Sequence, residues 1–242
     1  MFTVVPSIPV AFGRVVPEAE AERNPLRLAW RWMASGARRI HLEDRGGRRG
    51  NAPSTLPALV LGCQAGPALI QVGGGIWEPR EARALVGAGA ARLVVHAAWF
   101  HPRRLGRLAD AVGAERLVLG VRLPLPEGAG ALLKAARALG VAEAVLSGPA
   151  WNPESVRDAV APWVDQGFVV WAAGHIETLE AVEALKAVGA RGAIVGRALY
   201  LRRLDWQALR GLEVPRPVPT PPGQRVPCAG ARPWAAQEAK DA

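Results

Sequence analysis

The chain carries an imperfect copy of part of itself at a spacing of 100 residues. The segment VGGGI at 72–76 corresponds to AAGHI at 172–176, and the match continues through Ala84-Leu85 with Ala184-Leu185, Gly89-Ala90 with Gly189-Ala190, and Val95 with Val195. Each copy reads as an apolar run, a glycine turn, an amphipathic helix, a Gly-Ala stop and a second apolar run, which is typical of a βαβ unit. A duplicated βαβ unit predicts a closed (β/α)8 barrel built from two repeated half-barrels.

The length of the chain fits one barrel followed by a tail. A chain of 242 residues can bury one large core and has the usual length of a single (β/α)8 domain, which we predict over residues 1–213. Residues 214–242 differ in composition, because their prolines exclude both a helix and a strand ladder: Pro215, Pro217, Pro219, Pro221, Pro222 and Pro227. We expect an extended, mobile tail there and treat it as a candidate contact for a protein partner.

The basic charge of the chain is dispersed. A formal net charge of +9 is compatible with nucleic-acid binding, because clustered Lys and Arg release counterions from a phosphate backbone. The arginines are instead scattered in short pairs, such as Arg38-Arg39 and Arg202-Arg203, without aromatic residues between them. This pattern favours a solvated surface and makes RNA the less favoured partner.

No segment of the sequence has the pattern of a membrane span or a signal peptide. No stretch approaches the roughly 18 to 20 uninterrupted apolar residues of a membrane helix. The N-terminus lacks a basic region followed by an apolar stretch, so we predict a cytoplasmic protein that does not contact membranes. Cys63 and Cys228 are isolated, so neither a disulfide framework nor a metal site is indicated.

Apolar runs and helical patterns alternate along the chain. Strands are predicted at 4–10, 39–43, 69–72, 92–95, 117–123, 143–146, 168–172 and 192–195. Two of the intervening helices begin with the same pair, Asn24-Pro25 and Asn152-Pro153, in which Asn caps the helix and Pro takes the first helical position. The first run contains Pro6 and Pro9, which fit poorly with a strand at the centre of a sheet.

Glycine turns after three of these strands are candidate phosphate-binding sites. A glycine lets an anion approach backbone N–H groups, and in barrels of this kind phosphates commonly bind after the seventh and eighth strands. The candidates are Gly73, Gly74 and Gly75 after the third strand, Gly174 and His175 after the seventh, and Gly196 and Arg197 after the eighth. Because the repeat relates the turn after the third strand to the turn after the seventh, these two turns should face each other across the barrel mouth. They would suit an elongated ligand with two anionic ends. The alternative is that these glycines only permit tight turns.

Several motifs resemble those of a known family. The segments QVGGGI at 71–76, IHLED at 40–44 and AIVGRALY at 193–200, together with Pro6 and GRVV at 13–16, resemble the ProFAR isomerase of histidine biosynthesis. The resemblance covers residues 3–205 and extends more weakly to the cyclase subunit of imidazole glycerol phosphate synthase. It implies a TIM barrel, a bisphosphorylated ribonucleotide substrate, and an Amadori rearrangement of an aminoaldose to an aminoketose without metal or organic cofactor.

The departures from this family fall on the chemistry. The family has an aspartate at the end of strand one and another at the end of strand five, and the aligned residues here are Pro9 and Arg122. Neither can act as a general base near neutral pH, although the rearrangement needs a general acid and a general base. Glu43 and Asp44 are the remaining carboxylate candidates. His96 and His175 lie at strand ends where a ring could contact phosphate or move protons, whereas His41 is predicted to belong to the barrel packing.

Two functions therefore remain open. The first is a divergent or inactive isomerase-like barrel that keeps a phosphate-binding face for a phosphorylated sugar or ribonucleotide. The second is a non-catalytic phosphosugar sensor, or a partner-binding protein that uses the tail. In both, Asp44 can equally be an acceptor that holds its own loop in place, and the histidines can fill space.

Overall fold

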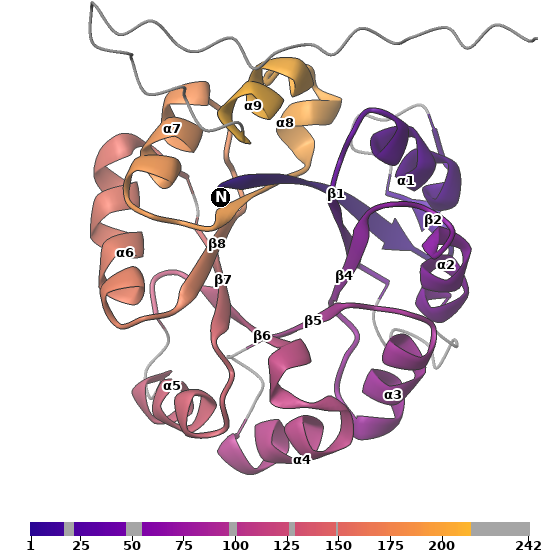
Figure 1. The fold of residues 1–242 in the computed structure, drawn as a ribbon, viewed down its shortest axis with the longest axis vertical. Coiled ribbons are helices and arrows are strands. Elements are labelled where there is room, and N and C mark those ends of the chain that lie inside the picture. Colours follow the sequence, from indigo (N-terminus) through magenta and orange to yellow (C-terminus); the bar gives the residue numbers. More distant parts are fainter. Residues whose placement is uncertain (17–21, 47–54, 97–100, 126–128, 149, 214–242) are drawn as a thin grey trace, which may run out of the picture.

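The protein is a closed barrel of parallel strands surrounded by helices (Figure 1). The computed structural model describes residues 1–16, 22–46, 55–96, 101–125, 129–148 and 150–213, so the predicted tail at 214–242 lies outside the described residues. The barrel strands are β1 (Thr3–Ala11), β3 (Arg39–Asp44), β4 (Leu69–Gly73), β5 (Arg92–His96), β6 (Leu117–Arg122), β7 (Glu143–Ser147), β8 (Val169–Ala173) and β9 (Gly192–Val195). They pair in this order, and β9 closes on β1.

The helices cover the outside of this ring, as Figure 1 shows from the end of the barrel at which the strands begin. They are α1 (Pro25–Ala34), α2 (Leu56–Cys63), α3 (Pro79–Gly87), α4 (Pro102–Val112), α5 (Ala129–Ala138), α6 (Pro153–Asp165), α7 (Leu179–Ala187), α8 (Arg197–Tyr200) and α9 (Trp206–Glu213). A 3-10 turn over Ala114–Arg116 precedes β6. This arrangement confirms the predicted (β/α)8 fold.

The internal repeat predicted from the sequence is visible in the boundaries of the elements. The units β4-α3-β5 and β8-α7-β9 begin at residues 69, 79 and 92 and at 169, 179 and 192, a constant offset of 100. Gly74 and Gly174 share the left-handed backbone conformation, with φ of 80° and 76°. The two units are four strands apart in the eight-membered ring, so their turns lie on opposite sides of the mouth.

Local capping explains where the predicted helices start. The side chain of Asn24 accepts from the amides of Leu26 and Arg27 at 3.0 and 3.2 Å. Asn152 exchanges hydrogen bonds with Ser155 at the start of α6, accepting from its amide at 2.8 Å. These oxygens satisfy amides that have no partner within the helix.

The apolar core has two parts. The larger part fills the space between the strands and the helices, and a smaller cluster lies within the barrel: Val5, Val94, Val118, Val145, Trp171 and Ile194. A barrel of eight strands is narrow enough for such side chains to fill it, so the interior of the barrel is a packed core.

One expectation about the first strand needs correction, and three short elements were not predicted. β1 pairs with both β3 and β9 despite Pro6 and Pro9, so the prolines do not exclude a central position. Each proline removes one N–H donor, and the adjacent residues continue the ladders. The short β2 (Arg14–Val15), α8 and α9 were not predicted from the sequence. α9 is anchored to β1 because Glu213 accepts from the amide of Val4 at 2.8 Å.

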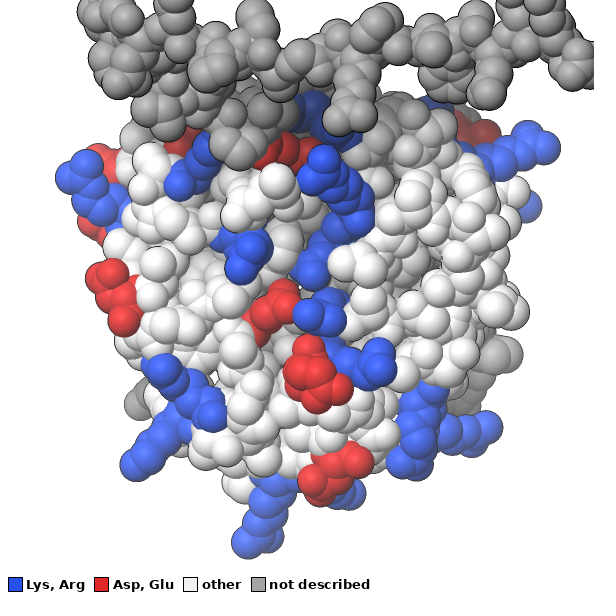
Figure 2. Space-filling view, in the orientation of Figure 1, with Lys and Arg blue, Asp and Glu red and all other residues white. Residues whose placement is uncertain are grey.

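Charged side chains close the end of the barrel at which the strands begin. Glu143 on β7 accepts from Arg92 Nε through Oε1 at 2.7 Å and from Trp171 Nε1 through Oε2 at 2.9 Å. Arg39 Nη1 lies 3.6 Å from the same Oε2. The guanidinium of Arg39 also stacks on the Trp171 ring, 4.2 Å from its centroid. On this face basic and acidic side chains meet at the centre, and further basic and acidic groups lie around them (Figure 2).

Candidate functional site

A cavity of about 860 Å³ lies at the opposite end of the barrel, where the strands finish. It is lined by the last residues of the barrel strands and by the turns that follow them. Ligand sites of (β/α)8 barrels are built at this end, because the loops after the strands can vary without disturbing the core. The cavity volume is within the range of ordinary small-molecule sites.

The predicted glycine turns meet in this cavity from opposite sides. Gly73 and Gly74 line it after β4, and Gly174 and His175 line it after β8. A side chain on Gly174 would place its Cβ 2.8 Å from the carbonyl oxygen of Gly148, so this turn requires glycine. Gly75 is not among the lining residues and lies instead beside the Asp44 carboxylate.

The third turn brings a cation to the same rim. Gly196 and Arg197 follow β9 and line the cavity, and the Arg197 side chain is exposed. His175 is the repeat counterpart of Gly75 and has a φ of 27°, a conformation that costs free energy for a residue with a Cβ. A strained histidine beside a glycine turn and an arginine is compatible with an anion site.

Pro9 and Arg122 both line the cavity; Pro9 lies two residues before the end of β1, and Arg122 lies at the end of β6. Pro9 has no titratable group, and the guanidinium of Arg122 carries hydrogen-bond donors only. The two positions at which the resemblance implies aspartates therefore face the ligand space with residues that cannot accept a proton near neutral pH. Arg122 adds positive charge to the site.

The two carboxylates predicted as candidates have different surroundings. Glu43 lines the cavity in register with Pro9 on the adjacent strand, and its Oε2 lies 3.3 Å from Arg45 Nε. Asp44 also lines the cavity, and its Oδ1 accepts from the amide of Gly46 at 2.9 Å. Asp44 thus supports its own loop, whereas Glu43 stands next to the place where a family aspartate is expected.

Two histidines face the same space. His96 ends β5 and lines the cavity. Burial lowers its pKa, and the positive charge of Arg122 lowers it further, so the ring is neutral at neutral pH. His41, which we had predicted to serve packing alone, is 8% exposed and also lines the cavity, and burial lowers its pKa to about 4.

The sequence patterns did not single out several residues of the site. Ser7, Ser147 and Tyr200 line the cavity, and the Tyr200 hydroxyl donates to the carbonyl oxygen of Ser7 at 2.6 Å. The alternation of β1 and β7 could have indicated which of their residues point inward. The contact between Tyr200 and Ser7 could not have been found, because it joins residues 193 positions apart.

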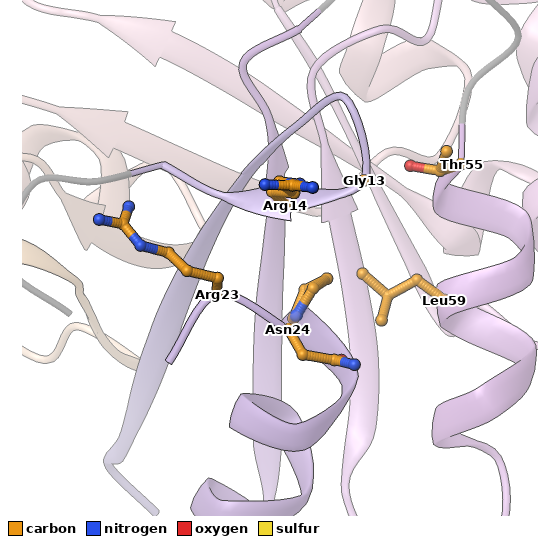
Figure 3. Close-up of a pocket in the computed structure, with 7 residues that line it drawn as sticks. Gly13, Arg14, Arg23, Asn24, Thr55 and Leu59 are labelled. Carbon is orange, nitrogen blue, oxygen red and sulfur yellow. The ribbon is translucent and has the colours of Figure 1, made fainter. Parts of the chain in front are cut away.

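A second hollow of about 470 Å³ lies outside the barrel, between the β1–β2 turn and the starts of α1 and α2 (Figure 3). Arg14 and Arg23 line it, but Arg23 extends away from Thr55 and Leu59, so the charged groups do not converge on one point. Asn24, also in its lining, is engaged in capping α1. The mouth cavity is therefore the candidate functional site.

Neither a metal cluster nor a membrane helix is found in the part of the chain that the structure describes. No three His, Cys, Asp or Glu residues there are arranged to hold a metal ion. None of the helices described has the length and apolar character required to cross a bilayer.

Comparison with known proteins identifies the family. A family described as "Histidine biosynthesis protein" matches residues 3–124. A curated relative from Halobacterium salinarum is 32% identical over 226 residues, which cover 82% of this chain and 92% of the relative. A relative from Methanosarcina acetivorans is 29% identical over 86% of this chain and 96% of the relative, and one from Chloroflexus aggregans is 27% identical over 81% and 92%.

These relatives share one name, 1-(5-phosphoribosyl)-5-((5-phosphoribosylamino)methylideneamino)imidazole-4-carboxamide isomerase, which is the ProFAR isomerase. The similarity spans more than nine tenths of their length, and the family match at residues 3–124 includes β1 and β3 to β6 of the barrel. The chain is thus a member of the histidine biosynthesis protein family, of the ProFAR isomerase type.

Proposed function

We propose that this protein binds a phosphorylated ribonucleotide of the ProFAR type in the mouth cavity and isomerises it far more slowly than a family member that has both aspartates. The cavity residues support this proposal. Glycine turns face each other across the mouth, and Arg197, Arg122 and His175 add donors for anionic oxygens. The observation that carries the loss of turnover is the presence of Pro9 and Arg122 at the two strand ends.

Glu43 is the carboxylate best placed to support residual turnover. It is the register partner of Pro9, so its side chain enters the same part of the cavity. Its Oε2 lies 3.3 Å from Arg45 Nε, and a carboxylate can accept a proton from a ligand. His96, a neutral ring in the same cavity, is the second group that can exchange protons.

Calorimetry with ProFAR tests the binding part. We expect binding by the wild-type chain and a roughly tenfold loss of affinity in Arg197→Ala, the size expected for one charge-assisted hydrogen bond. Arg107→Ala, which removes an exposed arginine of α4, serves as the matched control and should bind like the wild type. Absence of binding by the folded wild type would refute the ligand assignment.

A turnover assay tests the catalytic part. A missing general acid or base costs a factor of about a hundred or more, so the rate should be lower by at least that factor than for the Halobacterium salinarum relative under the same conditions. Any residual rate should disappear in Glu43→Gln and persist in Glu177→Gln, which changes a third carboxylate of the cavity lining, one that pairs with Arg203. A wild-type rate equal to that of the relative would contradict the proposal.

Ligand binding without any turnover is the second candidate function, and Arg122 favours it. An arginine at a catalytic position strengthens the hold on an anionic ligand while it supplies no base. A protein that binds ProFAR with unchanged affinity in Glu43→Gln and shows no detectable product would act as a phosphosugar sensor. The predicted tail at 214–242 is then the candidate contact for a protein partner, which its deletion tests in a pull-down.

A further inference from the structure

The His41 ring lies between the charged end of the barrel and the ligand cavity. Its Nδ1 edge faces Gln71, its register partner on β4, at a distance of 3.1 Å from Nε2 of the amide. Its other edge lies beside Gly73, where an added Cβ would be 2.8 Å from Cε1 and 3.1 Å from Nε2 of the ring. Gly73 and His41 both line the cavity, so the missing side chain at 73 leaves room for this edge.

The orientation of the Gln71 amide is determined by Arg39. Arg39 Nη1 donates to Gln71 Oε1 at 3.3 Å. A guanidinium has donors and no acceptor, so the carbonyl oxygen of the amide must face Arg39 and the NH2 group must face His41. The Gln71 NH2 group then donates to Nδ1 of His41.

Arg39 is itself held in place by the charged cluster. Its side chain is 9% exposed, pairs with Glu143 and stacks on Trp171. Gln71 is fully buried, so a reversed amide would place its NH2 donors against the guanidinium donors of Arg39 without water between them. The order Glu143, Arg39, Gln71, His41 therefore has one favourable arrangement of donors and acceptors.

We propose that Arg39 and Gln71 are positioning residues that hold His41 as a neutral ring with its proton on Nε2, so that His41 presents a hydrogen-bond donor to the ligand in the cavity. The contact with a ligand rests on the proposed function, whereas the protonation state belongs to the free protein. Among the described residues, Nε2 has no hydrogen-bond partner. Such a donor selects an oxygen acceptor on the ligand, such as a sugar hydroxyl or a carbonyl, and disfavours a cationic group.

Charge and burial agree with a neutral ring. Burial lowers the pKa of His41 to about 4, with Glu43 acting in the opposite direction and Arg39 in the same direction. Both charged residues belong to the same strand as His41, and Gln71, the hydrogen-bond partner across the strand boundary, is uncharged.

Nitrogen NMR of the full-length protein at neutral pH, with labelled histidine, tests the tautomer directly. We expect the protonated nitrogen of His41 to be Nε2 in the wild type. In Gln71→Glu the carboxylate accepts from the ring, so the proton should move to Nδ1 and the pKa should rise. Gln207→Glu, an exposed change on α9, should leave His41 unchanged. A proton on Nδ1 in the wild type overturns the proposal without any variant.

Calorimetry with ProFAR and with inorganic phosphate tests the ligand contact. His41→Phe removes the donor and keeps a ring, so affinity for ProFAR should fall roughly fivefold, as for one lost hydrogen bond, while affinity for inorganic phosphate stays the same. Unchanged ProFAR affinity in a folded His41→Phe overturns the contact alone. Failure of the wild type to bind either probe overturns the proposed function as well, which keeps the two failures distinct.

Discussion

Arg92 and Glu143 meet at the end of the barrel where the strands begin, although they are 51 residues apart in the chain, and Arg92 Nε donates to Glu143 Oε1 at 2.7 Å. Burial alone raises the pKa of Glu143, but hydrogen bonds from Arg92 and Trp171 and the charge of Arg39 outweigh burial and lower it. One carboxylate thus compensates two arginines at the end of the barrel away from the ligand.

Glu143→Gln should destabilise the protein by about 3 kcal/mol, because it leaves the buried guanidinium of Arg39 and the half-buried one of Arg92 without their counter-charge. The free energy of unfolding in urea at neutral pH measures this change. Glu183→Gln, an exposed change on α7, should stay within about 0.5 kcal/mol of the wild type. Because folding lowers the pKa of Glu143, its stabilising effect is fully present above pH 4.5, the pKa of glutamate in the unfolded chain. This effect is lost as the pH falls through the lower pKa of the folded protein.

His41 should make the protein less stable in acid. Its pKa is lowered from 6.5 to about 4, so the unfolded chain binds a proton that the folded protein does not. The stability of the folded protein is therefore unaffected by protonation of His41 above pH 6.5 and falls as the pH falls towards 4, by roughly 3 kcal/mol in total. Across that range the free energy of unfolding should depend less on pH in His41→Phe than in the wild type. Equal slopes in the two proteins would show that His41 is not buried as a neutral ring.

Gly174→Ala should reduce both stability and ligand affinity. Its φ of 76° disfavours a side chain, and the new Cβ would contact the Gly148 carbonyl, so we expect a loss of about 2 kcal/mol. Gly106→Ala in α4 is the matched control, because nothing lies within 4 Å of its added Cβ and alanine favours a helix. Thermal unfolding should therefore move in opposite directions for the two variants.

His175→Gly should stabilise the fold by about 1 kcal/mol, because it relieves a φ of 27° on a residue with a Cβ. His175→Ala keeps the Cβ and should show no such gain. Both variants should bind inorganic phosphate more weakly if the ring donates to the anion, as we propose. Phosphate affinity that is the same in all three proteins would remove His175 from the site.

Pro9→Asp combined with Arg122→Asp should raise the rate of ProFAR isomerisation by a factor of about a hundred or more, since both changes place carboxylates in the cavity. The double variant Pro9→Asn and Arg122→Asn has nearly the same shape without acid or base groups, and it should show no gain. If the two double variants have equal rates, the slow turnover has another cause than the missing carboxylates.

The regular elements could be predicted from the sequence because their signals are local. Asn24-Pro25 and Asn152-Pro153 carry a cap and a helix start in adjacent residues, and the structure begins α1 and α6 there. The eight strands were predicted to within one or two residues of their ends, because a parallel strand buried on both faces reads as a short apolar run. The short helix α8, over 197–200, has no such periodic signal.

For the candidate site, the sequence could indicate which turns carry glycines, and the repeat placed them on opposite sides of the mouth. It could not show that Gly73 lines the cavity while Gly75 lies beside Asp44, since that depends on the path of two neighbouring loops. The double role of His41, in packing and in the cavity, was also missed. The position of the His41 ring depends on the Gln71 side chain of the next strand.

The amino-acid sequence by itself determined the barrel, its internal repeat and the absence of carboxylates at positions 9 and 122. These properties follow from apolar periodicity and residue identity, which act over a few neighbouring residues. Only the tertiary structure decided the contact of His41 with Gln71 and the pairing of Glu143 with Arg39 and Arg92. Hydrogen bonds and charge interactions between strands depend on register and burial, and these arise only when the ring of strands closes.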